Sequence, residues 1–255
     1  MNGFAVLLRK ELLESVRTLR LPIVAGLFLV LGILSPVTAR YLREIVQAFA
    51  PADIGVVIPP PTASDALDQL QKNIGQFGAL AAVLLTMGSV AVEKERGTAA
   101  FVLVKPVARA AFLAAKVVDL GIVLGVATVL AIGAGWAYTV ILFGPQQIGG
   151  WIVLGVLLWL STGAYAAVTF VGSTLTRSSL AAAGIGFGGL IVLALLSTVP
   201  QIGRYLPAGL VTLGKAVALG RTAAGTDALG PIVAVTALIV TALAAAWLSF
   251  RRQEL

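Results

Sequence analysis

The stretch VVDLGIVLGVATVLAIGAGWAYTVIL, residues 117–142, holds a single charged side chain, Asp119, which lies near its start. A helix needs about 20 mostly apolar residues to cross the hydrocarbon core of a bilayer. Apolar and polar residues do not alternate here, as they would in a strand of a membrane barrel. We therefore predict a membrane-spanning helix, which satisfies its own backbone hydrogen bonds where water is absent.

The composition of the whole chain agrees with this prediction. Of its 255 residues, 59% are hydrophobic and only 11% are charged, whereas a soluble domain has about 25% charged residues. So few charged residues cannot cover the solvent-exposed surface of a soluble protein of this size. The composition therefore indicates an integral membrane protein.

Five further stretches have the same apolar character. We predict an all-α membrane protein with six transmembrane helices in a single transmembrane domain, residues 1–255. The long segments 40–73 and 200–229 are predicted to be external loops. The six predicted spans are approximately residues 21–39, 74–92, 117–142, 151–172, 179–199 and 230–250.

The distribution of Lys and Arg predicts the orientation. Twelve of the 18 lie in the N-terminus, the loops after the second and fourth spans, and the C-terminal tail. Loops rich in Lys and Arg stay in the cytoplasm, so both termini are predicted to be cytoplasmic. The same bias explains the net charge of +7 without a nucleic-acid partner. A signal peptide cleaved after residues 37–39 was the alternative, but cleavage would leave an odd number of spans.

The residues before the first span form two faces of a predicted helix. The apolar face and the charged face together indicate an amphipathic helix that lies in the membrane interface, within residues 1–20. The apolar face comprises Phe4, Leu8, Leu12, Val16 and Leu19, and the charged residues are Arg9, Lys10, Glu11, Glu14, Arg17 and Arg20.

The two external segments differ in character. In residues 40–73, Ser64 is predicted to be the N-cap of a helix. Residues 200–229 are long and largely apolar, which a wholly solvated loop would not need. Two interpretations remain open for this segment: a re-entrant or interfacial helix, or a cap packed on the bundle.

Several kinds of chemistry have no support in the sequence. The chain has no Cys and no His, which excludes thiolate and imidazole chemistry. No ionisable residue lies near the middle of a span, as an ion-coupled carrier would require, and Asp119 is expected to meet headgroup water or a partner such as Lys116. We predict no catalytic residue, no cofactor-binding site and no metal site in this chain.

Residues 209–215 fit the spacing of a phosphate-binding loop, G-x-x-x-x-G-K. The next residue is Ala216, not the Ser or Thr that would hold Mg²⁺. No strand is predicted before this segment, and the charge distribution places it outside the cell. We therefore predict that the chain has no nucleotide site.

Glycines recur inside the third and fifth spans, at residues 121–125 and 184–189. Small residues four positions apart let helix backbones approach closely. Packing within the chain, a subunit interface and a face lining a pathway are the alternatives for these glycines. The second and fifth spans are the candidates for lining a pathway.

The segment EKERGTAAFVLVKPVAR, residues 93–109, interrupts the apolar pattern. Gly97 is predicted to end the second span, Thr98 is a good N-cap, and Lys105 before Pro106 is biased out of the helical region. These signals bound a helix of about seven residues, roughly 10 Å long. The helix has three apolar side chains, Phe101, Leu103 and Val104. They are expected to be removed from water, either in the lipid interface or in a pocket of a soluble partner.

The sequence resembles the permease subunits of type-2 ABC transporters. The resemblance lies in RKELLESVR (residues 9–17), EKERGT (93–98) and KPVAR (105–109), together with the six spans. It implies that the short helix is a coupling helix that docks on a separately encoded ATPase, and that the N-terminal helix is an interfacial elbow beside it. The residues so implicated in coupling are Glu93, Lys94, Glu95, Arg96, Gly97, Thr98, Phe101, Leu103, Val104, Lys105, Pro106 and Arg109.

The resemblance also implies an assembly. Two ATPase subunits, which would bind ATP and Mg²⁺, are expected to join two permease copies, as a homodimer or a related heterodimer, in the plasma membrane of a prokaryote. The expected activity is export. The alternative is a multi-span membrane anchor or assembly factor that recruits a cytoplasmic protein and transports nothing.

Overall fold

The computed structural model describes residues 3–49, 59–98, 108–221 and 228–253, and these residues form helices without strands. Six helical segments are long and apolar enough to cross a membrane. This confirms the predicted all-α membrane fold. The six are α2 (Arg20–Phe49), α3 (Ala63–Met87) continued by α4 (Ala91–Glu95), α6 (Arg109–Phe143), α7 (Ile148–Leu175), α8 (Ser179–Ser197) and α11 (Leu229–Arg251).

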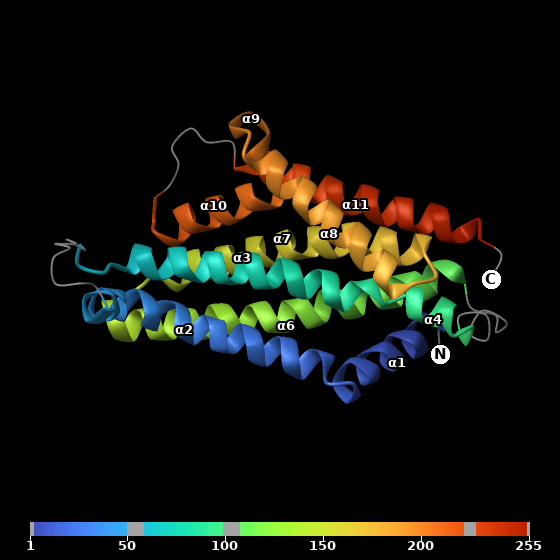
Figure 1. Cartoon of the computed structure of the whole chain (residues 1–255), viewed down its shortest axis with the longest axis horizontal. Helices are drawn as coiled ribbons and strands as arrows, with labels where there is room; N and C mark the ends of the chain where they lie inside the picture. The colour runs from blue at the N-terminus through green and yellow to red at the C-terminus, as the bar shows by residue number, and fades with distance from the viewer. Residues whose placement is uncertain (1–2, 50–58, 99–107, 222–227, 254–255) are drawn as a thin grey trace.

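The long helices run side by side along the longest axis of the molecule (Figure 1). The described N- and C-terminal residues lie at one end together with α4, and we call this the terminal end. The last turn of α2, the first turn of α3 and the connection from α6 to α7 lie at the other end, which we call the opposite end (Figure 1). Within the described residues, the other helices are α1 (Gly3–Arg17), α9 (Pro200–Gly203) and α10 (Pro207–Ala218).

Two helices extend well beyond the spans predicted for them. α2 continues to Phe49 and α3 begins at Ala63, so much of segment 40–73 is helical and not loop. Arg40 and Glu44 form an i, i+4 ion pair at 3.7 Å on the extended part of α2. A charged residue ends an apolar run in the sequence, but it does not end a helix.

The N-cap of α3 is Thr62, so the prediction of Ser64 was wrong by two positions. The backbone amide and the hydroxyl of Thr62 donate to Asp65 Oδ2 at 2.8 and 2.7 Å. This bridging across three positions is the geometry of a capping box. Ser64 lies inside the first turn of the helix.

α7 is the central helix, packed by α3, α6, α8, α10 and α11. The largest core cluster includes Phe28, Leu70, Leu154 and Trp151. α10 lies along α7: Leu210 is fully buried, and the backbone of Ala218 lies against Gly150. α10 thus packs on the bundle, and a re-entrant or interfacial position for it stays a prediction.

Glycines inside the spans have two different surroundings. A Cβ on Gly186 would meet Thr169 of α7 at 2.6 Å, and one on Gly32 would meet the carbonyl oxygen of Ala131 at 2.5 Å. Gly184 and Gly188 have nothing within 4 Å of such a Cβ. Packing within the chain therefore accounts for Gly186, whereas Gly184 and Gly188 face outward.

Gly32 offers a test of the closest helix contact. Gly32→Ala should destabilise the protein by about 1–3 kcal/mol, because backbone atoms of α6 cannot move aside for the added methyl group. Gly26→Ala is the matched control on the same helix, since nothing lies within 4 Å of its Cβ. Denaturant unfolding of the purified protein in detergent measures both. Equal stability of the two variants would contradict the α2–α6 contact.

Candidate functional site

The segment predicted to couple to a partner begins where α3 ends, at the terminal end of the bundle. The helix breaks between Met87 and Ala91, which the sequence did not predict. Ser173 of α7 causes the break: its hydroxyl donates to Met87 O at 3.0 Å and accepts from the amides of Val90 and Ala91 at 3.0 and 3.1 Å. A side chain inserted into the backbone ladder bends a helix in this way.

The chain turns again at Gly97, whose φ of 70° is left-handed. This is the conformation expected of a glycine that ends a helix. The Thr98 hydroxyl donates back to Glu93 O at 3.2 Å. The predicted coupling helix beyond it, with Phe101, Leu103, Val104, Lys105 and Pro106, lies outside the described residues and stays a prediction.

Glu93 joins three helices through one oxygen atom. Its Oε1 accepts from Lys10 of α1 and from Lys116 of α6, each at 2.9 Å. Lys116 also donates to Glu11 of α1 at 3.1 Å. The side chains of Lys116 and Glu11 are only 3% and 9% exposed, so these charges depend on one another to be tolerated away from water.

Glu11, Glu93 and Lys116 form a charge cluster, and Lys10 contacts this cluster from its more exposed side. Partial burial alone would lower the pKa of this amine, but hydrogen bonds and the charges of Glu11 and Glu93 outweigh that effect and raise the pKa above its ordinary value. Lys10 also lies 3.1 Å from Glu14. It therefore stays charged throughout the physiological pH range.

A second polar link joins α1 to α6. Ser15 donates to Asp119 Oδ2 at 2.7 Å, and both residues are buried. The sequence had suggested headgroup water or Lys116 as the partner of Asp119, but the bonds of Lys116 go to Glu11 and Glu93. α1 therefore turns a polar stripe, Glu11 and Ser15, toward the bundle.

The predicted apolar face of α1 is only partly buried. Phe4 and Val16 are exposed, as lipid contact requires, and Leu8 and Leu12 are partly buried. Leu19 lies after the end of α1, in a turn with a φ of 60°. Arg9 and Arg17 are exposed. An interfacial position for α1 stays a prediction.

Lys94 is anchored on the side of α4 that faces α7. Its amine donates to the carbonyl oxygen of Thr174 and, at 2.6 Å, to Gln253 Oε1. The amide nitrogen of Gln253 donates to the same Thr174 oxygen at 3.0 Å. Lys94 is therefore held by the end of α7 and by the C-terminal tail.

Gln253 also reaches the far end of the coupling segment. Arg109 Nη1 donates to the carbonyl oxygens of Arg251 and Gln253 at 2.9 and 3.1 Å. Gln253 thus contacts both Lys94 and Arg109, which lie near the two ends of the coupling segment. The sequence did not predict this role for Gln253, because its partners on other elements lie 79 to 159 positions away and no motif marks it.

The predicted coupling residues that the structure describes divide into two groups. Glu93, Lys94 and Arg109 bond to other helices of this chain. The turn of Glu95, Arg96, Gly97 and Thr98 is exposed, and within the described residues neither Glu95 nor Arg96 takes part in an ion pair. Among residues 93–98, this turn is therefore the part that is accessible to another molecule.

Two features resemble sites for a metal or a nucleotide, and neither has the required geometry. Carboxylates of Glu11, Glu14 and Glu93 lie within 4.8 Å of one another, but Lys10 and Lys116 already supply the positive charge between them. The phosphate-loop pattern at residues 209–215 lies inside helix α10. Its backbone amides are therefore committed to helical bonds and cannot cradle a phosphate.

Comparison with known proteins identifies a family profile and a relative. The sequence profile described as ABC-2 family transporter protein matches residues 5–255. An uncharacterised transmembrane protein of Bacillus subtilis, YxlG, is 24% identical, and the alignment spans 100% of this chain and 99% of that protein.

Lys116 tests the charge cluster. Lys116→Met should destabilise the protein by about 2–3 kcal/mol, because it removes the buried charge-assisted hydrogen bonds to Glu11 and Glu93 and leaves both carboxylates with only the more exposed Lys10. Lys10→Met should cost less than about 1 kcal/mol, because the Lys10 side chain is 45% exposed. Denaturant unfolding of both variants measures the difference. A Lys116→Met variant as stable as wild type would mean that the cluster contributes nothing.

Gln253 tests the link between the two ends of the coupling segment. Gln253→Ala should accelerate amide hydrogen exchange in residues 91–98 at least fivefold, because each lost hydrogen bond is worth about 1 kcal/mol. Arg252→Ala, at the neighbouring exposed position, is the control. Mass spectrometry of peptides from both variants gives the rates, and unchanged exchange in Gln253→Ala would refute the link.

Proposed function

The chain belongs to the ABC-2 transporter family and is a membrane-spanning permease subunit, and from this premise we propose that a separately encoded ABC ATPase docks on segment 93–109 and drives it. One observation carries the proposal beyond family membership. The turn Glu95–Thr98 is exposed, while its flanking residues are bonded to the long helices. An exposed turn whose neighbouring residues are bonded to the long helices can transmit a movement of a docked partner to those helices.

The anchors define how a movement would spread. A displacement of the turn pulls Glu93 against Lys10 and Lys116, and so acts on α1 and α6. The same displacement pulls Lys94 against the end of α7 and the tail after α11. ATP and Mg²⁺ bind to the partner in this proposal, and the permease contributes only rigid-body gating.

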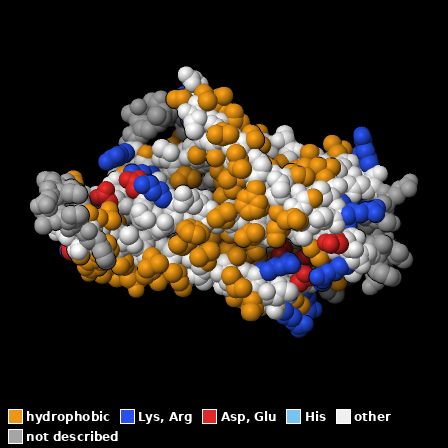
Figure 2. Space-filling view, viewed as in Figure 1, with side chains coloured by type: hydrophobic (Ala, Val, Ile, Leu, Met, Phe, Trp, Pro, Cys, Tyr) orange, Lys and Arg blue, Asp and Glu red, His pale blue; other side chains and the backbone are white. Residues whose placement is uncertain are grey.

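The proposed assembly has two permease copies and two ATPase subunits, with a two-fold axis along the membrane normal. The outward glycines of α8, Gly184 and Gly188, support a close contact with another helix. Exposed apolar side chains gather over the middle of the molecule, between charged groups near both ends (Figure 2). This band has the distribution expected of a surface in lipid.

The orientation and direction complete the proposal. Excess Lys and Arg support placing the terminal end in the cytoplasm, at the plasma membrane of a prokaryote. The docking segment contains four basic residues, Lys94, Arg96, Lys105 and Arg109. Export is proposed from the resemblance to exporters of this family.

Arg96 provides the test of docking. Arg96→Glu should reduce the amount of co-purified ATPase about tenfold, because it reverses a charge at the exposed turn. Arg43→Glu is the charge-matched control on α2, an exposed position toward the opposite end. The measurement uses the neighbouring ATPase gene co-expressed with the full-length permease, and scores both co-purification and ATP turnover.

The outcomes separate the proposal from its alternative. Loss of co-purification in Arg96→Glu but not in Arg43→Glu supports docking at the turn. Wild-type binding and stimulated turnover in Arg96→Glu would refute it. An ATPase that binds wild-type permease without any change in turnover would instead favour the non-transporting anchor.

A further inference from the structure

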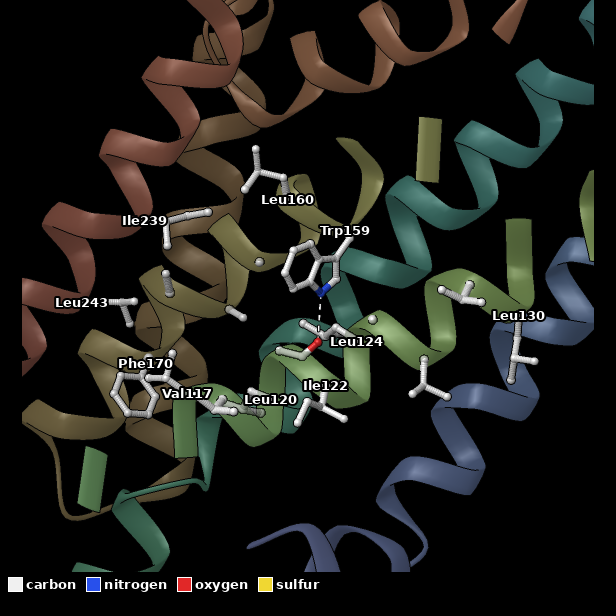
Figure 3. A pocket seen from close by; sticks show the side chains of 18 residues that line it. Val117, Leu120, Ile122, Leu124, Leu130, Trp159, Leu160, Phe170, Ile239 and Leu243 are labelled. Carbon is white, nitrogen blue, oxygen red and sulfur yellow. Dashed lines mark hydrogen bonds between the residues drawn. The ribbon is translucent and has the colours of Figure 1, made fainter. Parts of the chain in front are cut away.

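An open groove lies among α6, α7 and α11 on the surface of the bundle. Its volume is about 800 Å³, within the range of ligand sites. The side chains that line it come from all three helices (Figure 3). Phe112 of α6 stacks on Phe250 of α11 with ring centroids 5.7 Å apart, which joins the two walls near the terminal end.

The lining of the groove is apolar along its whole length, without an ionisable residue. Trp159 stands in its wall, and its indole nitrogen donates to Gly121 O at 2.9 Å (Figure 3). The one polar group of this side chain is therefore already satisfied. Only a hydrocarbon occupant gains by filling such a space.

The length of the groove matches the depth of one leaflet. On α6 the groove extends from Val117 to Leu130, about 20 Å at 1.5 Å per residue, which is comparable with the roughly 15 Å depth of one leaflet. Lipid chains and an apolar protein helix both suit this lining, and the cations at one end of the groove favour an amphiphile with an anionic head group.

Cations lie beyond the end of the groove that is nearest the terminal end. Ile239 and Leu243 line the groove, and Trp247 and Arg251 continue this row at four-residue intervals on α11, with the Arg251 guanidinium 4.9 Å from the ring centroid of Trp247. Arg109 of α6 bonds to the carbonyl oxygen of Arg251 through one nitrogen. Within the described part of the chain, neither arginine has a carboxylate partner.

We propose that the groove is a binding site for an anionic glycerophospholipid of the leaflet at the terminal end. Its acyl chains lie between α6 and α11 against Trp159, and its phosphate lies at Arg251 and Arg109. The proposed orientation makes this the cytoplasmic leaflet, whose anionic lipids attract basic residues next to a span. The site does not require an ATPase partner, so it stands or falls separately from the proposed function.

The test counts lipids on the purified full-length chain by native mass spectrometry after exchange into phosphatidylglycerol or phosphatidylcholine in mild detergent. Wild type should retain one phosphatidylglycerol per chain, about fivefold in preference to phosphatidylcholine. Arg251→Gln should remove this preference, while Arg252→Gln, the adjacent exposed arginine, should keep it. Equal retention of the two lipids by wild type would overturn the proposal.

A second pair of variants tests the groove itself. A Cβ on Gly163 meets Ile239 at an ordinary 3.9 Å, so Gly163→Leu should fit while filling the groove, and should lower lipid retention at least tenfold. Gly133→Leu is the control, because nothing lies within 4 Å of its Cβ. Retention at the wild-type level in Gly163→Leu would overturn the proposal. Dissociation of a dimer in Gly163→Leu, with lipid retention unchanged, would also overturn the proposal. It would identify a second copy of the chain as the occupant of the groove.

Discussion

A single carboxylate oxygen, Glu93 Oε1, accepts hydrogen bonds from lysines of two other helices. Lys116 is almost fully buried, and a buried ammonium is tolerated only when its charge is matched and its protons are bonded. That constraint fixes where α1 and α4 lie relative to α6, since Glu11 and Glu93 must both reach one amine. The terminal end of the bundle therefore has little freedom, although lipid provides no hydrophobic force that would hold its helices together.

The two sides of the coupling segment are restrained by different chemistry. Glu93 is held by charge, within a cluster that lies partly out of water. Lys94 and Arg109 are held by carbonyl oxygens and by Gln253 at the end of the chain. Carbonyl oxygens at the C-terminal end of a helix have no partner in that helix, so basic side chains bind there without a desolvated carboxylate. A movement of the proposed docking turn thus reaches α6 by one route and α7 and α11 by the other.

The sequence predicted the helices far better than the contacts between them. Hydropathy located all six spans, because lipid admits few polar residues, and Gly97 was identified because a left-handed turn favours glycine. The break after Met87 escaped prediction, since its cause is the hydroxyl of Ser173 on another helix. Gln253 and the true partner of Asp119, Ser15, escaped for the same reason. Local propensity and hydropathy do not predict hydrogen bonds between residues that lie about a hundred positions apart in the sequence.

α6 connects the two proposals through the residues near its start. Arg109 bonds to the end of α11, Lys116 holds the charge cluster, and Val117 begins the wall of the groove. A guanidinium has five donors in a fixed plane, and Arg109 uses one nitrogen for both of its carbonyl partners. The same side chain can therefore hold a lipid phosphate without releasing the C-terminal tail. Any tilt of α6 away from α11 would widen the groove and loosen that tail together, which would make lipid occupancy and the anchoring of the docking segment energetically linked.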